Sequence, residues 1–187
     1  MSEATEQASR IEDVELRELT VHGDHRGRVF EGWRESWTPF TVRQLTEGRA
    51  QAGVMKGLHM HYLQWDWWRV VTGRMLVGLY DARPKSPTFG VSVSFEMNPE
   101  LPTALAIPPG VAHGYYAIED LEMIYLLSEV YNPDDEFGVR WDSVGIDWPF
   151  LATGQQPLIS ERDVNLPTAD ELKFSPPPGA PHFSEGT

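Results

Sequence analysis

Apolar and polar residues alternate in short runs along most of the chain, and this pattern predicts an all-β fold. Val91, Val93 and Phe95 alternate with polar residues, which is the period of two expected for a half-buried strand. The short apolar runs at 104–107 and 123–127 are bounded by turn-forming residues, as strands usually are. Evenly spaced strands of this kind favour a barrel or a sandwich.

The pattern also predicts two local features. The apolar runs at 70–71 and 75–80 stand on either side of a turn at 72–73, which indicates a β-hairpin. A short helix is expected near the C-terminus, at 168–173, where good helix formers follow a proline. Helical periodicity is weak between residues 20 and 150.

The ends of the chain differ from its centre. A chain of 187 residues has the length of about one domain. The polar segment 1–12 is expected to be flexible or to pair with a partner subunit, and the segment 174–187 is expected to be a Pro-rich disordered tail. The domain itself is therefore placed at 13–173.

Composition and charge narrow the classes of partner. Asp and Glu outnumber Lys and Arg by 28 to 15, and the net charge of −13 argues against nucleic acid or an anionic membrane as the main partner. A small anionic ligand is still compatible, because a few local cations act at short range. The chain has no cysteine, which excludes disulfides, thiolate metal sites and a cysteine nucleophile. No apolar run approaches the roughly 20 residues of a membrane span, and the N-terminus has no signal-peptide pattern, so a cytoplasmic protein is expected.

Histidines and a carboxylate recur at a spacing that suits a metal or a catalytic site. His59 and His61 are two residues apart, Asp66 follows five residues later, and His113 comes just after a Pro-Pro-Gly turn. Residues i and i+2 of a strand face the same side, so the first two imidazoles are expected to project together. Such a set is a sufficient first shell for Zn, Fe, Ni or Mn. The spacing resembles the two signature motifs of the cupin superfamily, which implies a jelly-roll barrel, also called a double-stranded β-helix.

A longer series of motifs runs from roughly residue 20 to residue 165. In chain order these are Asp24-His25-Arg26-Gly27, Phe30-Glu31, Gly53 to His59, the D-x-R-x-x-S-P-T-F-G segment from Asp81 to Gly90, Pro109 to Gly114, Tyr125, Tyr131-Asn132-Pro133, Trp141-Asp142, Trp148-Pro149 and Ile159 to Asp163. In this order they resemble the dTDP-4-dehydrorhamnose 3,5-epimerase family, of which the chain is identified as a member.

The resemblance implies an acid–base mechanism. The family removes a proton next to a sugar ketone and returns one on the other face, which requires a base and an acid. By resemblance, His59 is the base and Asp163 orients its imidazole ring. Tyr125 is the acid, because a phenol keeps its proton at neutral pH.

The resemblance also implies the substrate contacts and the assembly. The expected substrate is a nucleotide sugar bound by a homodimer, the usual state of the family. The diphosphate is expected to meet charged and amide side chains, the sugar to lie in a pocket, and the base or ribose end to contact a segment near the dimer interface. The residues implied are Arg26, Gln44 and Lys56 for the diphosphate, His113 and Tyr131 for the sugar, and Phe30 and Glu31 for the nucleoside.

Several positions depart from the family pattern. Lys56 replaces an Arg and Thr46 an Asn, and His61 stands where the family usually lacks a histidine. Asp66 replaces the Lys that is expected to stabilise the enolate, which reverses the sign of the local field. A unit-charge contact at about 4 Å and an effective dielectric constant of about 20 is worth about 4 kcal/mol. Pairing of Asp66 with Arg69 or Lys56 is one way to compensate it.

Three functions follow as alternatives. The favoured one is a cofactor-independent epimerase that acts at C3 and/or C5 of a dTDP-4-keto-6-deoxyhexose, because the base, its carboxylate and the tyrosine are all present. The second is a metal-dependent cupin enzyme, a tailoring isomerase, cyclase or oxygenase, with a divalent ion held by His59, His61, Asp66 and His113. The third is a non-catalytic sugar-binding cupin. In the second, His59 is a metal ligand, and the nitrogen that binds the ion cannot also serve as the base.

Overall fold

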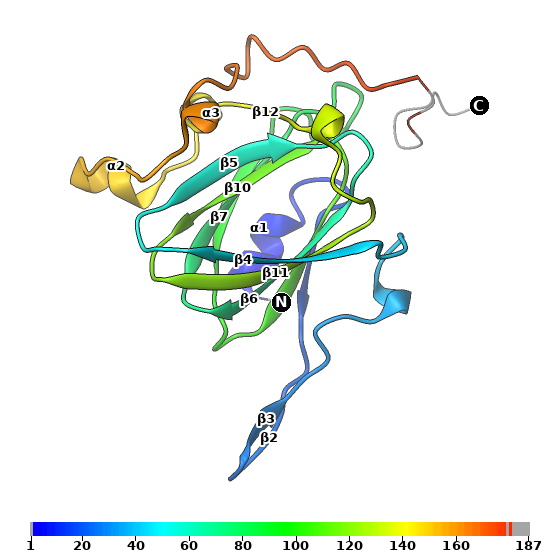
Figure 1. The fold of residues 1–187 in the computed structure, drawn as a ribbon, viewed down its shortest axis with the longest axis vertical. Coiled ribbons are helices and arrows are strands. Elements are labelled where there is room, and N and C mark those ends of the chain that lie inside the picture. Colours follow the sequence, from blue (N-terminus) through cyan, green and yellow to red (C-terminus); the bar gives the residue numbers. More distant parts are fainter. Residues whose placement is uncertain (1, 179, 181–187) are drawn as a thin grey trace.

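Two five-stranded antiparallel sheets form the body of the chain in the computed structural model, which describes residues 2–178 and 180 (Figure 1). The first sheet has the order β1 (Glu15–Glu18), β9 (Thr103–Ile107), β6 (Asp66–Thr72), β11 (Leu121–Leu127) and β4 (Gln44–Ala50). The second has the order β12 (Phe137–Gly138), β5 (Met55–Met60), β10 (Val111–Ala117), β7 (Met75–Asp81) and β8 (Ser92–Met97). Most successive strands from β4 onward change sheet, and the predicted all-β jelly roll is confirmed.

The hairpin predicted around residues 72–73 is wrong. β6 and β7 are joined by this turn but belong to different sheets, so the chain crosses from one sheet to the other there. Gly73 has a φ of +78°, and a Cβ atom at this position would lie 2.0 Å from the carbonyl oxygen of Asp120. The turn is therefore a tight corner of the jelly roll, and two apolar runs on either side of a glycine cannot distinguish a corner from a hairpin.

The space between the sheets changes from apolar to polar along the strands. On β6, Val70 belongs to the apolar core, whereas Asp66 at the other end of the same face lines a cavity. β10 repeats this change from Ala117 to His113, and β11 from Met123 to Tyr125. Residues two apart on a strand share a face, so the same period-two pattern builds both the core and the pocket.

The outer faces of the sheets are covered by aromatic side chains from the connections. Trp148 and Phe150 pack over the second sheet, and Gly78 makes room for the indole, because a Cβ atom there would lie 2.5 Å from Trp148. Trp67 packs on the outside of the first sheet. The connections also hold the helices α2 (Pro149–Thr153) and α3 (Glu161–Val164) and short 3-10 helices at Glu35–Trp37, Pro133–Asp135 and Trp141–Ser143. No helix among the described residues is long and apolar enough to cross a membrane.

The D-x-R-x-x-S-P-T-F-G segment is a structural motif. Asp81 is fully buried and accepts hydrogen bonds from Arg83, Ser86 and Thr88. Burial by itself raises the pKa of Asp81, but these bonds hold it below its usual range. A buried carboxylate is stable only when it is paired and hydrogen-bonded in this way, so the motif locks the loop between β7 and β8.

We expected residues 1–12 to be flexible, and the structure differs. Residues Glu3–Ala8 form helix α1, which packs against β1 and β8. Ala8 and Ile11 are buried in the core between the sheets. The segment looks polar in sequence because only one narrow face carries apolar side chains, too few for a periodic signal.

The C-terminal helix lies earlier than expected. Residues 161–164 form α3, whereas 168–173 form only a turn in which Glu171 accepts hydrogen bonds from the backbone and hydroxyl of Thr168. A run of six residues before a proline-rich segment is too short to extend this cap into a helix. Of the predicted tail 174–187, residues 179 and 181–187 lie outside the described part of the chain. Residues 174–178 have no regular structure, but Phe174 packs edge-on against Tyr62.

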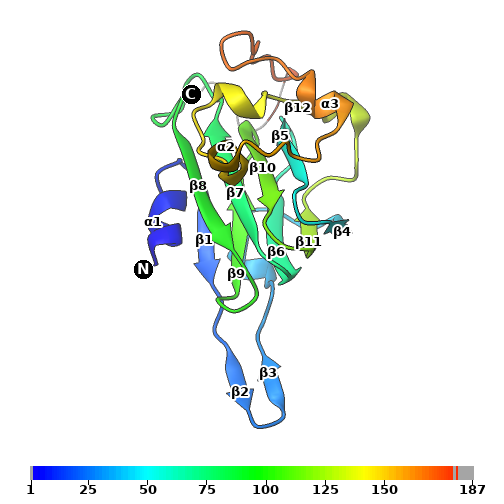
Figure 2. The same ribbon diagram turned by 90° about the vertical axis from the view of Figure 1, so that its left-hand side faces the viewer.

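A two-stranded hairpin extends away from the body. It consists of β2 (His22–Asp24) and β3 (Gly27–Val29), and both views show it projecting beyond the two sheets (Figures 1 and 2). Every residue of both strands is exposed. An isolated hairpin of this kind is at best marginally stable in water, so we expect it to pack against a further protein surface.

Candidate active site

A cavity of about 540 Å³ opens between the polar ends of the two sheets. Its walls come from β4, β5, β6, β10, β11 and the loops that follow β5 and β11. Most of the side chains singled out in the sequence line it, and they are Gln44, Lys56, His59, His61, Asp66, His113, Tyr125 and Tyr131.

His59 and Asp163 are 104 residues apart in the chain but form a direct contact. His59 lies near the end of β5, and its Nε2 atom is 2.7 Å from Oδ1 of Asp163. Asp163 lies on α3, which packs beside β5 because the preceding segment bridges to that strand at Leu158. The second carboxylate oxygen accepts the backbone N–H of Gly57 at 3.1 Å. Gly57 has a φ of +105° and approaches β10 so closely that a Cβ atom would lie 2.7 Å from a carbonyl oxygen.

This contact determines the protonation of the dyad. Asp163 is almost completely buried, and burial by itself raises its pKa, but the hydrogen bond and the charge of His59 hold the pKa below its usual range. An ionised carboxylate only accepts hydrogen bonds, so the Nε2 atom of His59 carries a hydrogen and donates a hydrogen bond to Asp163. The Nδ1 atom of a neutral ring is then a lone-pair acceptor. Among the described residues, none is hydrogen-bonded to that atom.

Tyr125 reaches the cavity from the other sheet. It lies on β11, and its ring packs edge-on against Trp68 with centroids 5.5 Å apart. Gly48 of the neighbouring strand gives the ring space, because a Cβ atom there would lie 2.8 Å from the Tyr125 ring. Burial, followed by the neighbouring Tyr115, raises the pKa of the Tyr125 hydroxyl, which keeps it protonated at neutral pH. His59 and this phenol thus lie on opposite sheets.

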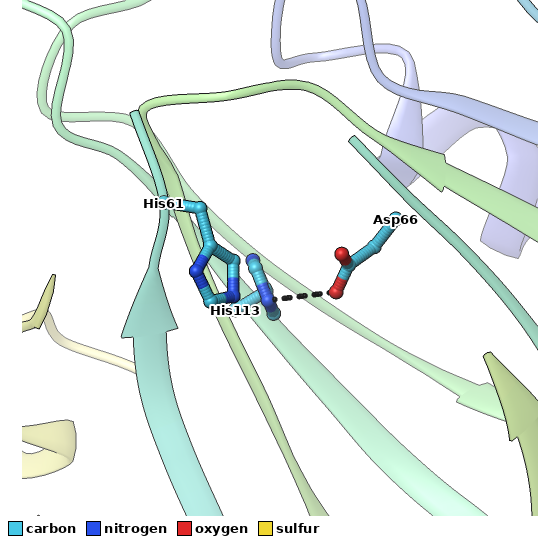
Figure 3. A group of neighbouring side chains, drawn as sticks. All are labelled: His61, Asp66 and His113. Carbon is cyan, nitrogen blue, oxygen red and sulfur yellow. Dashed lines mark ion pairs between the residues drawn. The ribbon is translucent and has the colours of Figure 1, made fainter. Parts of the chain in front are cut away.

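His61, Asp66 and His113 form a second cluster in the same cavity (Figure 3). All three are buried, and the Nε2 atom of His113 is 3.2 Å from Oδ2 of Asp66. The carboxylate also accepts hydrogen bonds from the Gln64 amide at 2.6 Å and from the Trp68 indole at 3.1 Å. Asp66 therefore pairs with His113, and the expected pairing with Arg69 or Lys56 is wrong.

Charge in this cluster is balanced within it. Burial opposes ionisation of Asp66, but the hydrogen bond and charge of His113 hold the pKa of Asp66 below its usual range. Burial likewise lowers the pKa of His113, and Asp66 reverses this and raises it above the usual value. Both pKa shifts favour the ionised pair, with a proton on His113.

His59 lies outside the second cluster. The metal-dependent alternative counts it among the ligands of an ion, but the group found among the described residues consists of His61, Asp66 and His113. The Nε2 atom of His59 is engaged by Asp163 instead. The two histidines that are two residues apart both line the cavity, as their spacing predicts, yet they take part in different contacts.

Arg26, Phe30 and Glu31 do not line the cavity of their own chain. Arg26 lies at the turn of the β2–β3 hairpin, pairs with Asp24, and leaves 79% of its side chain exposed. Phe30 and Glu31 line a separate hollow at the base of the hairpin. A sequence motif cannot reveal this separation, because the hairpin moves these residues away from the sheets as one unit.

Sequence reasoning missed four residues that shape the site. Trp68 and Gln64 donate to Asp66, Gly48 accommodates Tyr125, and Tyr115 faces the cavity with a buried hydroxyl that has no hydrogen-bond partner among the described residues. Trp68 is on the same face of β6 as Asp66, so the period of two was the signal that could have identified it.

The fold and this site define a cupin-like jelly-roll protein whose pocket contains a histidine–carboxylate dyad opposite a partly buried tyrosine. Residues 8–171 match the family model described as dTDP-4-dehydrorhamnose 3,5-epimerase. The dTDP-4-dehydrorhamnose 3,5-epimerase of Shigella flexneri is 32% identical over 169 residues, which cover 84% of this chain and 91% of that protein. The chain belongs to the dTDP-4-dehydrorhamnose 3,5-epimerase family, and the resemblance of its motifs is thereby confirmed.

Solved structures agree with this membership. ChmJ, a 3'-monoepimerase from Streptomyces bikiniensis in complex with dTDP-quinovose, has a TM-score of 0.80 and 32% identity, with 86% of each chain covered. The dTDP-6-deoxy-D-glucose-3,5-epimerase RmlC of Legionella pneumophila, in complex with dTDP-4-keto-L-rhamnose, has a TM-score of 0.80 and 27% identity over 87% of this chain and 91% of that one.

Proposed function

We propose that this protein epimerises a dTDP-4-keto-6-deoxyhexose at C3, at C5 or at both carbons. The observation that carries the proposal is the His59–Asp163 contact at the wall of the cavity, with Tyr125 on the opposite sheet. Family membership supports the reaction type, and the dTDP-sugar complexes of related structures support the substrate class.

The chemistry requires a proton to leave one face of a carbon and another proton to arrive on the other face. The Nδ1 atom of His59 takes the proton from the carbon next to the ketone, and Asp163 stabilises the imidazolium that forms. The electrons of the broken C–H bond pass into the ketone and give an enolate. The Tyr125 hydroxyl then delivers its proton to the opposite face, which inverts the carbon. Exchange with water resets both groups, and the mechanism uses side chains of this chain without an organic cofactor.

The mouth of the cavity is suited to the rest of the substrate. Gln44 accepts the backbone N–H of Tyr131 at 2.9 Å and donates to Thr46, which fixes its amide at the rim. Lys56 is exposed on β5 and lines the cavity. We assign the diphosphate to Gln44 and Lys56, and the sugar to Tyr131 and to the wall formed by His113.

The charges of the cavity indicate that a second subunit completes it. Among the lining residues, Lys56 shares the cavity with the carboxylate of Glu47. Asp66 is paired with His113 and Glu136 with Arg162, so the cavity offers few cations of its own to a diphosphate. Arg26 lies on an exposed hairpin that has no surface of its own to pack on. We therefore propose a two-fold homodimer in which the hairpin brings Arg26, Phe30 and Glu31 to the nucleotide in the partner's cavity.

The reaction itself is tested by solvent exchange. The protein is incubated in D2O with dTDP-4-keto-6-deoxyglucose, and deuterium is followed by NMR at C3 and C5. We expect deuterium at one or both carbons, together with inversion at the carbon that exchanges. A folded protein that binds dTDP tightly but incorporates no deuterium would overturn the proposal and favour a sugar-binding protein.

The exchange of hairpins is tested by subunit complementation. Arg26→Ala and His59→Gln subunits with different tags are co-expressed, and the mixed dimers are compared with each variant alone. Each variant alone should be inactive at low substrate concentration, whereas random mixing restores about a quarter of the sites to the intact combination. Failure of the mixed dimers to regain activity, with dimers confirmed by both tags, would contradict a shared site.

A further inference from the structure

We propose that His61, Asp66 and His113 bind a divalent first-row transition metal ion. The three side chains come from the residue just after β5, the start of β6 and the middle of β10, and Figure 3 shows them pointing toward one another. Their ligand atoms all lie within 4.8 Å of one another, and each residue is more than nine-tenths buried. Two imidazoles and one carboxylate are a common donor set for such ions.

The orientation of the two rings supports this assignment. Nδ1 of His61 lies 2.8 Å from the carbonyl oxygen of Asp135, and Nδ1 of His113 lies 2.9 Å from that of Val111. A carbonyl only accepts, so each Nδ1 carries the proton and each Nε2 is directed toward Asp66. Backbone carbonyls hold metal-binding histidines in this way in many proteins, because they fix the tautomer and leave Nε2 to the ion.

A proton satisfies this cluster only in part. A proton on Nε2 of His113 bridges to Asp66, but no described group hydrogen-bonds to Nε2 of His61. The two rings are near each other, with centroids 5.5 Å apart, and both residues line the cavity, from which an ion can reach them. A divalent ion coordinates all three donor atoms at once, whereas the proton serves only two of them.

The separations between the ligand atoms are close to those found around a coordinated metal ion. Bonds of about 2.0–2.2 Å place the ligand atoms of a tetrahedral ion about 3.4 Å apart. The His113–Asp66 pair, at 3.2 Å, already has this spacing, and the ligand atom of His61 lies within 4.8 Å of both. Gln64 and Trp68 hold the carboxylate from outside the cluster. The nitrogen donors favour Zn²⁺, Fe²⁺, Co²⁺ or Ni²⁺ over Ca²⁺ and Mg²⁺.

The consequence for catalysis rests on the proposed function. The ion pair of Asp66 and His113 has no net charge and lies in a cavity where an enolate would form. A divalent ion held by Asp66 and two neutral imidazoles would give this cluster a net positive charge. All three ligands also line the cavity, so an ion held by them would be accessible to a molecule bound there. His59 remains uncoordinated and available as the base, because Asp163 holds its other nitrogen.

Metal binding is tested directly on the full chain. Protein dialysed against a chelator is titrated with ZnCl₂ by calorimetry and with CoCl₂ by visible absorption. We expect one ion per chain, with d–d bands of cobalt bound by nitrogen and oxygen. Asp66→Asn and His61→Gln should each weaken binding by more than the roughly 10- to 100-fold loss that follows removal of an outer-shell partner. Near-ultraviolet circular dichroism checks that the variants fold.

Two matched variants separate this site from other acidic groups and from the catalytic dyad. Asp147→Asn removes an exposed carboxylate and His59→Gln removes the neighbouring histidine, and both should bind the ion like the wild type. Absence of stoichiometric binding, or binding that survives in both Asp66→Asn and His61→Gln, would overturn the metal site. Deuterium exchange on the same samples tests the proposed function separately. Exchange without metal binding would refute only the metal site, and metal binding without exchange would refute only the epimerase activity.

Discussion

His59→Gln abolishes epimerisation, with an expected fall in kcat of at least about 100-fold and up to about 10⁴-fold, the usual range for loss of a general base. Glutamine keeps an N–H donor near Asp163, so the carboxylate at 2.7 Å from the original ring stays paired. What is lost is the lone pair of Nδ1, which is the proton acceptor in the proposed mechanism. Deuterium exchange from D2O should fall by the same factor, because both processes begin with removal of the same proton.

Binding provides the control for this variant. His59 is not among the residues that we assign to the diphosphate, so the affinity for dTDP should be unchanged. A variant that loses dTDP binding along with activity would indicate a damaged pocket, and a variant that keeps the wild-type exchange rate would remove His59 from the mechanism.

The role of Asp163 follows from a second comparison. Asp163→Asn leaves a hydrogen bond to His59 but removes the charge that stabilises the imidazolium, so kcat should fall with little change in KM. The dyad acts as one unit, and the double variant should be no slower than His59→Gln alone. Losses that multiply in the double variant would mean that Asp163 acts independently of the ring.

The sequence was sufficient for the fold class and for the identity of most cavity residues. The period of two predicts that His59 and His61 face the same side, and both line the cavity, whereas His113 was expected there from its motif and Tyr125 from resemblance. The contact between His59 and Asp163 was implied only by resemblance, because no local pattern connects residues 104 positions apart. The pairing of β6 and β7 with different sheets was missed for a related reason, since a turn is local and the choice of sheet depends on the whole chain.

Electrostatics in the cavity was the part that sequence reasoning resolved least well. Asp66 looked like an isolated charge that needed Arg69 or Lys56, yet the structure surrounds it with donors from β6 and β10. Burial and strand register decide which groups meet, and neither can be read from charge alone. His113 therefore has two proposed roles. It forms a wall of the sugar site, and it pairs with Asp66, a carboxylate that the family pattern does not have.

The positions of the base and the acid on separate sheets have a consequence for stereochemistry. A proton that leaves toward β5 and a proton that arrives from β11 approach the carbon from different sides of the cavity. Inversion therefore depends on Tyr125, whereas exchange with solvent depends on His59 alone. The two measurements separate two residues that a single rate constant would combine.

Tyr125→Phe is the variant that reveals this separation. Phenylalanine keeps the ring against Trp68 and in the space above Gly48, so the pocket retains its shape while the hydroxyl proton is lost. Net inversion should fall by at least about 100-fold, the scale of general acid catalysis. His59 can still remove the proton and return a deuteron on the same face, so exchange without inversion should continue near the wild-type rate.

Tyr116→Phe is the matched control. Tyr116 packs against Phe150 on the face of β10 that points away from the cavity, so this variant should invert the sugar carbon at the normal rate. NMR of the sugar in D2O measures both processes in one sample, and unchanged inversion in Tyr125→Phe would show that the proton comes from another group.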